Sequence, residues 1–272
     1  MTDTVESIHG SIIQHGPHNN RIYLMHLHGK DVEGLIARLD RLAAERGYGK
    51  IFAKIPATCW HSFKSAGYIQ EARVPGFFNG QIDGLFIAKF LCADRQQTQA
   101  RSDFTQAQRK PTGTWPDDPR LLISACSPED AKAMAAIYRQ TFESYAFPIH
   151  RPEYIQCMMR KNALYFSVRT REQIAALAAA EIDATSQTCE MTDFATLPEY
   201  RRKGLAYRLL GRLDDEAHKR GVKTAYTIAR RDSDGMNRVF AQRGYLFAGC
   251  LAKNTQIGGR IRSMLVWYKS LA

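Results

Sequence analysis

The chain has 272 residues, of which 44% are hydrophobic and 24% are charged. This balance is ordinary for a globular protein and excludes collagen-like, low-complexity and wholly disordered classes. The longest uninterrupted apolar run, Ile174 to Ala180, is far shorter than the roughly 20 residues that a membrane-spanning helix needs. The first residues carry acids where a signal peptide would carry cations, so we expect a cytoplasmic protein.

The charge is less ordinary, because the formal net charge is +11. Such an excess suits an anionic partner, whether a nucleic acid, a membrane surface or a phosphorylated ligand, and composition does not choose among them. The six cysteines are scattered without CxxC or zinc-like spacing, and the N-terminal histidines have no supporting cysteine or carboxylate pattern. We therefore expect free thiols and no metal site.

A polar stretch separates two parts of the chain. Residues 93–120 are rich in Gln, Ser, Thr, Asp and Arg, contain Pro111 and Pro116, and lack a sustained apolar period. This composition predicts a linker between an N-terminal domain, residues 1–92, and a C-terminal domain, residues 121–272. The alternative is a long surface loop of one domain.

The N-terminal part begins its predicted structure with a helix that ends at Arg46-Gly47 and a strand at residues 50–55. Two strand-like runs follow Gly67-Tyr68, and the second ends in residues 85–91. In the C-terminal part, residues 121–125 predict a strand, and residues 128–142 predict a helix that Ser127 is able to cap.

The rest of the C-terminal part continues with a predicted hairpin, residues 163–168 and 174–182, and a strand at residues 189–197. The clearest helix spans residues 203–220, where Ala206, Leu209 and Leu213 share one face. A strand at 223–230, a helix at 234–243 and two closing strands follow. This order predicts a mixed α/β fold with helices packed on a largely antiparallel sheet.

The two parts share sequence features in the same order. Arg38-Leu39-Asp40 precedes a helix end as Arg212-Leu213-Asp214 does, and each is followed by a strand-like run. Further on, residues 63–68 parallel residues 240–245, each ending in Gly-Tyr. Agreement of order and spacing predicts a shared architecture, and the alternative is a chance match of common residues.

The segment Glu199–Ala206 lies between a predicted strand and the clearest helix. A helix N-terminus offers unpaired N–H groups and the positive end of its dipole, and Gly204 allows close approach of a ligand to the backbone. Three cations, Arg201, Arg202 and Lys203, precede the glycine, and more than half of the excess positive charge lies between residues 199 and 243. The segment predicts a pyrophosphate site, and the alternative is a solvated basic turn.

The pattern Arg201-x-x-Gly204-x-Ala206 resembles the acyl-CoA pyrophosphate loop of the GNAT superfamily of N-acetyltransferases. Downstream, Asn237 and Phe240 are similar to that family's next motif, and the element order from residue 121 onward agrees. The resemblance implies a GNAT acyltransferase domain with acetyl-CoA as co-substrate, preceded by a smaller GNAT-like α/β domain. That first domain lacks the loop, so we expect it to bind no CoA and to pack against the catalytic domain or shape its cleft.

Longer stretches are similar to the family of β-lysine Nε-acetyltransferases. They are residues 190–201, 224–230 and 235–237 in the C-terminal part, and 50–56 and 83–90 in the N-terminal part. The resemblance implies transfer of acetyl from acetyl-CoA to the ε-amine of β-lysine, whose product serves that family as a compatible solute (an osmolyte). The alternatives are another small amine or a protein lysine as acceptor, or a non-catalytic acetyl-CoA sensor.

Two acids are candidate catalytic residues. An alkyl amine has a pKa of ~10.4 and must lose a proton before it attacks a thioester. Glu190 lies on the strand that leads into the loop, where several GNAT enzymes that resemble this chain carry a catalytic glutamate. Asp193 should face the opposite side of a regular strand. A β-bulge, common in this family, would bring both acids to one cleft, where one binds an amine and the other acts as base.

The resemblance also implies where the co-substrate lies. The backbone of Thr196 and Leu197 would pair with the pantetheine arm and donate to the thioester oxygen. Asn237 would contact the same arm, or would instead bond its own backbone. Phe240 stands where many GNAT enzymes have the tyrosine that protonates the leaving thiolate, so the general acid is unassigned. The whole loop would hold the pyrophosphate: Arg201, Arg202, Lys203, Gly204, Leu205 and Ala206.

The basic excess raises one competing class, a nucleic-acid-binding protein. Against it, the cations gather around one loop and helix without interleaved aromatic side chains. We therefore expect a small-molecule amine as the partner, with neither nucleic acid nor membrane, and a homodimer as the assembly to test.

Overall fold

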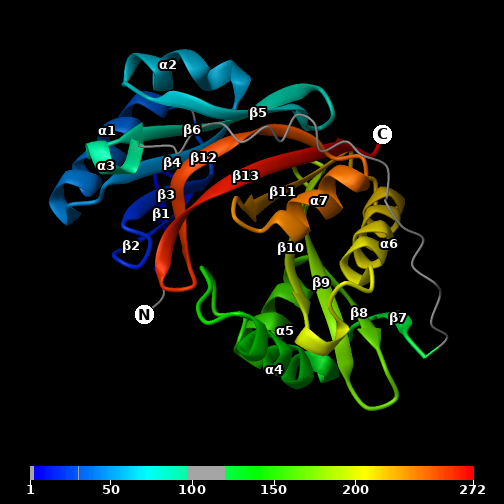
Figure 1. Cartoon of the computed structure of the whole chain (residues 1–272). Helices are drawn as coiled ribbons and strands as arrows, with labels where there is room; N and C mark the ends of the chain where they lie inside the picture. The colour runs from blue at the N-terminus through cyan, green and yellow to red at the C-terminus, as the bar shows by residue number, and fades with distance from the viewer. Residues whose placement is uncertain (1–2, 30, 97–119) are drawn as a thin grey trace.

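The computed structural model describes residues 3–29, 31–96 and 120–272, which fold around one long β-sheet with helices on its faces (Figure 1). The predicted linker, residues 93–120, lies for the most part outside the described residues. Its first residues, Ala93–Gln96, form the short helix α3. The division into domains 1–92 and 121–272 stays a prediction.

The N-terminal half packs helices α1 and α2 against strands around one hydrophobic core. The helix α1 ends at Arg46, and Gly47 takes the left-handed conformation (φ 66°) that suits a helix C-terminus. The sequence pattern does not indicate β1, because its residues are almost all exposed and show no apolar alternation. The elements are β1 (Thr4–Ile8), β2 (Ser11–Gly16), β3 (Arg21–His26), α1 (Val32–Arg46), β4 (Lys50–Pro56), α2 (Trp60–Ser65), β5 (Ile69–Phe78) and β6 (Ile82–Phe90).

The C-terminal half follows the predicted order, with the addition of α5. The clearest helix, α6, begins at Leu205 and not at residue 203, because Gly204 has φ 71° and cannot belong to the helix. The elements are β7 (Leu122–Ala125), α4 (Ala131–Thr141), α5 (Pro152–Lys161), β8 (Ala163–Arg169), β9 (Ile174–Asp183), β10 (Thr188–Thr196), α6 (Leu205–Lys219), β11 (Thr224–Arg230), α7 (Asp234–Gln242), β12 (Leu246–Ile257) and β13 (Arg260–Ser270).

The described strands form one mixed sheet in the order β1-β2-β3-β4-β6-β5-β12-β13-β11-β10-β9-β8-β7. Counted outward from the β5–β12 junction, strands β6, β4, β3, β2 and β1 take the places of β13, β11, β10, β9 and β8. The pairs β3–β4 and β10–β11 are parallel, and the other pairs named are antiparallel. The shared architecture that the matching sequence blocks predict is confirmed by this strand order.

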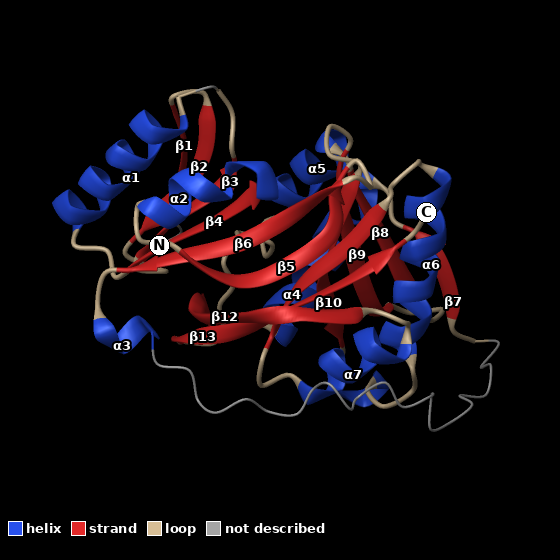
Figure 2. Cartoon of the chain, turned by 90° about the horizontal axis from the view of Figure 1, so that it is seen from above, coloured by secondary structure: helices blue, strands red, loops and turns tan. Residues whose placement is uncertain are grey.

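The helices of the C-terminal half cover both faces of the sheet (Figure 2). On β9, Ala176, Ala178 and Ala180 pack in the core beneath α6, whereas Leu177 and Ala179 pack in the core beneath α4 and α5. Because side chains alternate along a strand, α6 lies on one face and α4 and α5 on the other. Residue 181 continues the alternation of Leu177 and Ala179 along β9, so it faces the same side of the sheet as α4.

A buried ion pair joins the two halves at the β5–β12 junction. Nζ of Lys50 on β4 donates to Oε2 of Glu71 at 2.8 Å and to the Ala252 carbonyl at 2.7 Å. The Glu71 carboxylate also accepts the Ala252 N–H at 2.6 Å. Ala252 lies where β12 shifts register against β13, so these side chains satisfy backbone groups that the ladder leaves without partners.

Among the described helices, none is both long enough and apolar enough to cross a membrane.

Replacing Lys50 by methionine should lower the free energy of unfolding by about 3–5 kcal/mol, because it leaves the Glu71 carboxylate buried without its counter-ion. Urea unfolding followed by circular dichroism measures the change. The matched control is Lys89→Met, whose partner Asp40 is partly exposed, and which should cost less than about 1 kcal/mol. Equal losses in the two variants would contradict a special role for the buried pair.

Candidate active site

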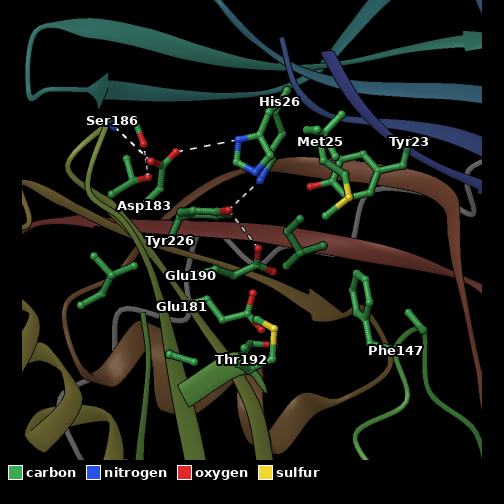
Figure 3. Close-up of a pocket in the computed structure, with 18 of the residues that line it drawn as sticks. Tyr23, Met25, His26, Phe147, Glu181, Asp183, Ser186, Glu190, Thr192 and Tyr226 are labelled. Atoms are coloured by element: carbon green, nitrogen blue, oxygen red, sulfur yellow. Dashed lines mark hydrogen bonds and ion pairs between the residues drawn. The ribbon is translucent and has the colours of Figure 1, made fainter. Parts of the chain in front are cut away.

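A cavity of about 710 Å³ lies between the two halves of the chain (Figure 3). Strands β3 and β4 of the N-terminal half line it with Tyr23, Phe52 and Lys54. The segment between α4 and α5 contributes Tyr145 and Phe147. Strands β9, β10 and β11 contribute acids and a hydroxyl group from the other side. The cavity is therefore built by both halves of the sheet.

Glu190 lies on β10 and points into this cavity (Figure 3). Its strand neighbours Cys189 and Met191 are buried in the core beneath α6, so alternation turns Glu190 to the opposite face. The hydroxyl of Tyr226 on β11 donates to Oε2 of Glu190 at 2.9 Å, and Nζ of Lys54 donates to the Tyr226 oxygen at 2.8 Å. Hydrogen bonds thus link an ammonium of the N-terminal half to a carboxylate of the C-terminal half.

The protonation states along this chain follow from its surroundings. Burial, reinforced by the charge of Glu190, raises the pKa of Tyr226 well above its ordinary value, so Tyr226 remains a neutral donor. Burial alone would lower the pKa of Lys54, but Tyr23 and Glu190 outweigh it and raise that pKa. Lys54 therefore remains an ammonium group.

Asp193 lies at a β-bulge, where the pairing of β10 with β9 shifts between Thr192 and Ala195. Its backbone has φ 55°, a left-handed conformation that residues other than glycine seldom adopt. The bulge expected from the sequence is confirmed, and Asp193 lines the same cavity as Glu190. Burial raises the pKa of Asp193 to about 6, although hydrogen bonds from Tyr145 and Thr192 favour the charged form.

A third acid in this cavity, Glu181 on β9, is one that the sequence analysis missed. Glu181 lies directly opposite Glu190 in the antiparallel ladder, an arrangement that brings two Cβ atoms to about 4.5–5.5 Å. Burial, then the charges of Asp193 and Glu190, raise the pKa of Glu181 to about 8. The sequence does show an acid directly after the apolar run of β9. That this acid lies opposite Glu190 depends on the register of β9 and β10.

The strands β10 and β11 pair only over their first three residues, which leaves an open edge on the rest of β10. An extended ligand arm can pair with such an edge. The Leu197 N–H does not face it, because it donates to the Ala175 carbonyl at 3.0 Å. Backbone groups alternate along a ladder, so Phe194 and Thr196 present theirs to the open edge. The Leu197 N–H is thus already bonded within the sheet, whereas the position of Thr196 is compatible with the role of donor. That these two residues contact the ligand arm stays a prediction.

The basic loop lies between the end of β10 and the start of α6. Arg201, Arg202 and Lys203 are exposed, and Arg202 and Gly204 have φ 62° and 71°. Gly204 is the N-cap of α6, and among the described residues the helix has no side-chain cap hydrogen bond. Arg201 also turns back, and its Nε donates to the Thr196 carbonyl at 3.3 Å. Uncapped N–H groups beside three cations are suited to a pyrophosphate.

Two residues of the loop, Leu205 and Ala206, are less exposed than its three cations. Leu205 is buried and Ala206 is half-buried, so we propose that they bind the pyrophosphate through their backbone groups.

In the N-terminal half, α1 takes the place of α6, but the Asp31 carboxylate caps it and accepts the Gly34 N–H at 2.8 Å. A negative cap occupies the groups that α6 leaves open. That the N-terminal half binds no CoA stays a prediction.

The Asn237 side chain lies in the core and bonds only protein groups in the described structure. Its Nδ2 donates to the carbonyl oxygens of Arg230, Arg231 and Ser233 at 2.9–3.3 Å. Its Oδ1 accepts the indole N–H of Trp267 at 3.0 Å. These bonds to nearby backbone groups agree with the alternative expected for this residue, and a contact with the CoA arm stays a prediction.

Phe240 is also a core residue, packed edge-on against Phe194 and Tyr245. Tyr245 does not take the place of the missing acid, because its hydroxyl donates to Oδ1 of Asp214 at 2.7 Å. The general acid stays unassigned. In the described parts of the chain, no group of three or more His, Cys, Asp or Glu side chains is placed to hold a metal ion.

The fold and the site together are those of an acyltransferase, with an open strand edge, a basic loop at the start of α6 and an acidic cavity. Residues 131–245 match the acetyltransferase (GNAT) family. The chain is 34% identical to a β-lysine N(6)-acetyltransferase of Methanococcus maripaludis, over 98% of both chains. It is 39% identical to one of Methanosarcina mazei, over 88% of this chain and 97% of that relative. It is 26% identical to the N-acetyltransferase YodP of Bacillus subtilis, over 96% of each.

The chain therefore belongs to the GNAT family and is an N-acetyltransferase. Acetyl-CoA is its co-substrate and supplies the acetyl group as a thioester. The residues at the loop and at the β10 edge fit this molecule, since they offer cations and uncapped N–H groups to the phosphates and an unpaired backbone edge to the arm.

The raised pKa values of Glu181 and Asp193 predict that the free energy of unfolding falls as pH rises from about 4, the ordinary pKa of a carboxyl group, to about 8. The folded chain holds protons that the unfolded chain has lost, so deprotonation favours unfolding. Glu181→Gln should flatten the part of the curve between about pH 6 and 8. Urea unfolding at several pH values measures both curves, and an unchanged slope in the variant would contradict the raised pKa of Glu181.

Proposed function

We propose that the chain transfers acetyl from acetyl-CoA to the ε-amine of β-lysine and forms Nε-acetyl-β-lysine. The names of the relatives that match most of the chain support this acceptor. The observation that carries the proposal is the cavity between the two halves, whose lining includes the acids Glu181, Glu190 and Asp193 and the ammonium of Lys54. β-Lysine brings two ammonium groups and one carboxylate, which complement that set of charges.

Glu190 is the proposed general base. It accepts the proton that the ε-ammonium must lose, and the free amine then attacks the acyl carbon of the thioester. The C–N bond forms as the C–S bond breaks, and the electron pair leaves with the thiolate. The nitrogen then loses its second proton to solvent, which leaves a neutral amide, and the thiolate takes up a proton from solvent to give CoA. Tyr226 and Lys54 hold Glu190 in place through the hydrogen bonds described above.

The backbone of β10 has the second role. The N–H groups of Phe194 and Thr196 are oriented by the ladder toward the open edge, where they can donate to the arm and to the thioester oxygen as charge develops on it. Phe240 provides no proton for the leaving thiolate. A thiol has a pKa near ~8.5, so the thiolate leaves without a protein acid at that position.

The loop residues are the proposed phosphate ligands, and the charge of the cavity selects the acceptor. The acids favour a small polycationic amine over a protein lysine, because a single protein lysine neutralises one carboxylate at most. We further propose that the product is a compatible solute, that the enzyme works in the cytoplasm, and that its oligomeric state is a homodimer.

Glu190→Gln should lower kcat by about 10²–10⁴-fold at pH 7, because the amide keeps the shape of the side chain but accepts no proton. The deficit should shrink as the pH approaches the pKa of the free amine, ~10.4, where the acceptor loses its proton without help. Release of CoA from acetyl-CoA with β-lysine as acceptor measures the rate.

The control for this experiment is Glu172→Gln, which changes an exposed glutamate in the turn between β8 and β9. It should retain the rate of the unchanged enzyme. A Glu190→Gln enzyme with the same pH profile as the unchanged enzyme would remove Glu190 from the role of base.

Gly204→Ala should raise the KM for acetyl-CoA by about tenfold or more, because the added methyl lies where phosphate must approach the backbone. The matched control is Gly221→Ala at the other end of α6. Gly221 has φ 77° and open space around it, so it carries the same conformational cost of ~1–2 kcal/mol without a ligand contact. Equal changes of KM in the two variants would mean that loop geometry, and not phosphate binding, is the cause.

A further inference from the structure

Glu181 is an acid without a partner inside the cavity. In the described structure no hydrogen bond or ion pair reaches its carboxylate, while Glu190 accepts from Tyr226 and Asp193 accepts from Thr192. Its cross-strand neighbour is Glu190, and like charges directly opposite each other destabilise a sheet. The charge of Lys54 favours the ionised form of Glu181, but burial and the charges of Asp193 and Glu190 outweigh it and raise the pKa of Glu181. A cationic group of the acceptor at this carboxylate would therefore relieve the repulsion among the three acids.

The other acids of the cavity are already engaged. Asp183 caps the turn after β9, since Oδ1 accepts the N–H groups of Thr185 and Ser186 at 2.9 and 3.3 Å. Its second oxygen lies 3.9 Å from Nδ1 of His26. Asp193 is fixed at the bulge and bonded by Tyr145. Glu181 is therefore the acid of this cavity whose carboxylate oxygens can accept hydrogen bonds from a ligand.

We propose that Glu181 binds the second ammonium group of the acceptor, the one that is not acetylated, and so selects diamines over monoamines. The inference rests on the proposed function. In β-lysine the chain between the two amines has four carbons, and Glu181 and Glu190 lie directly opposite each other on adjacent strands, where Cβ atoms are about 4.5–5.5 Å apart. One flexible diamine can therefore reach both side chains. With the ε-amine at Glu190, the second amine lies at Glu181 on the α4 side of the cavity.

The acceptor's carboxylate needs a cation, and Lys54 on β4 lines the same cavity with a pKa that keeps it charged. An ammonium has three N–H donors, so the bonds of Lys54 to Tyr226 and Tyr23 leave one donor for the acceptor's carboxylate.

The experiment compares two acceptors that differ by one group, β-lysine and 6-aminohexanoate, which lacks the β-amine. CoA release gives kcat and KM for the unchanged enzyme, Glu181→Gln and the exposed control Glu172→Gln. In Glu181→Gln, kcat/KM for β-lysine should fall about 10- to 100-fold, mainly through KM, as expected for a lost charged hydrogen bond. The value for 6-aminohexanoate should stay the same, so the preference for the diamine disappears. Circular dichroism confirms that the variant is folded.

Two results would overturn the inference while the proposed function stands. One is an equal loss on both acceptors, and the other is an unchanged preference for β-lysine in Glu181→Gln. If the unchanged enzyme does not acetylate β-lysine, the proposed function fails instead. Calorimetric titration with 1,4-diaminobutane and butylamine then decides the role of Glu181, because diamine binding that Glu181→Gln does not weaken would exclude it.

Discussion

The close contact between β5 and β12 is the constraint on which the cavity depends. A side chain at Gly249 would clash with the Glu71 carbonyl and with Ala72, so the two strands meet only because this position is glycine. Lys50 and Glu71 then bond both backbone groups of Ala252, and this ion pair is buried between the two halves. A buried pair adds little net stability but is costly to break, which makes it a device for holding one arrangement. That arrangement brings β3 and β4 to face β10 and β11 across the cavity.

The two halves share one strand order, but the acid and the hydroxyl group of the candidate site lie in the C-terminal half. Tyr23 pairs with Phe52 in the parallel strands of the N-terminal half, at the place where Glu190 pairs with Tyr226 in the other half. Two aromatic rings thus stand where the other half has Glu190 and its hydroxyl partner. The helix α1 is capped by the acid Asp31, a group that disfavours an anion at that position. Tyr23 and Phe52 instead form part of the wall of the neighbouring cavity.

The sequence predicts the parts of this protein that depend on local patterns. Periodicity and turn residues indicate most strands and helices, and the basic loop before α6 carries a recognisable pattern with a physical reason behind it. It fails where the answer depends on register or packing. Glu181 is found only when β9 is aligned with β10, and the inward turn of Asn237 needs the indole of Trp267 from β13. The direction of the Leu197 N–H follows from the ladder, which one strand alone does not reveal.

The hydrogen bonds from Lys54 through Tyr226 to Glu190 explain why the catalytic half keeps its partner. A carboxylate that must accept a proton from a flexible amine needs a fixed position, and a hydroxyl already bound to an ammonium holds its orientation on the other side. The ammonium comes from β4, so the position of Glu190, the proposed base, depends on the docking of the other half. Under the proposed mechanism, the N-terminal half contributes to catalysis through position and charge.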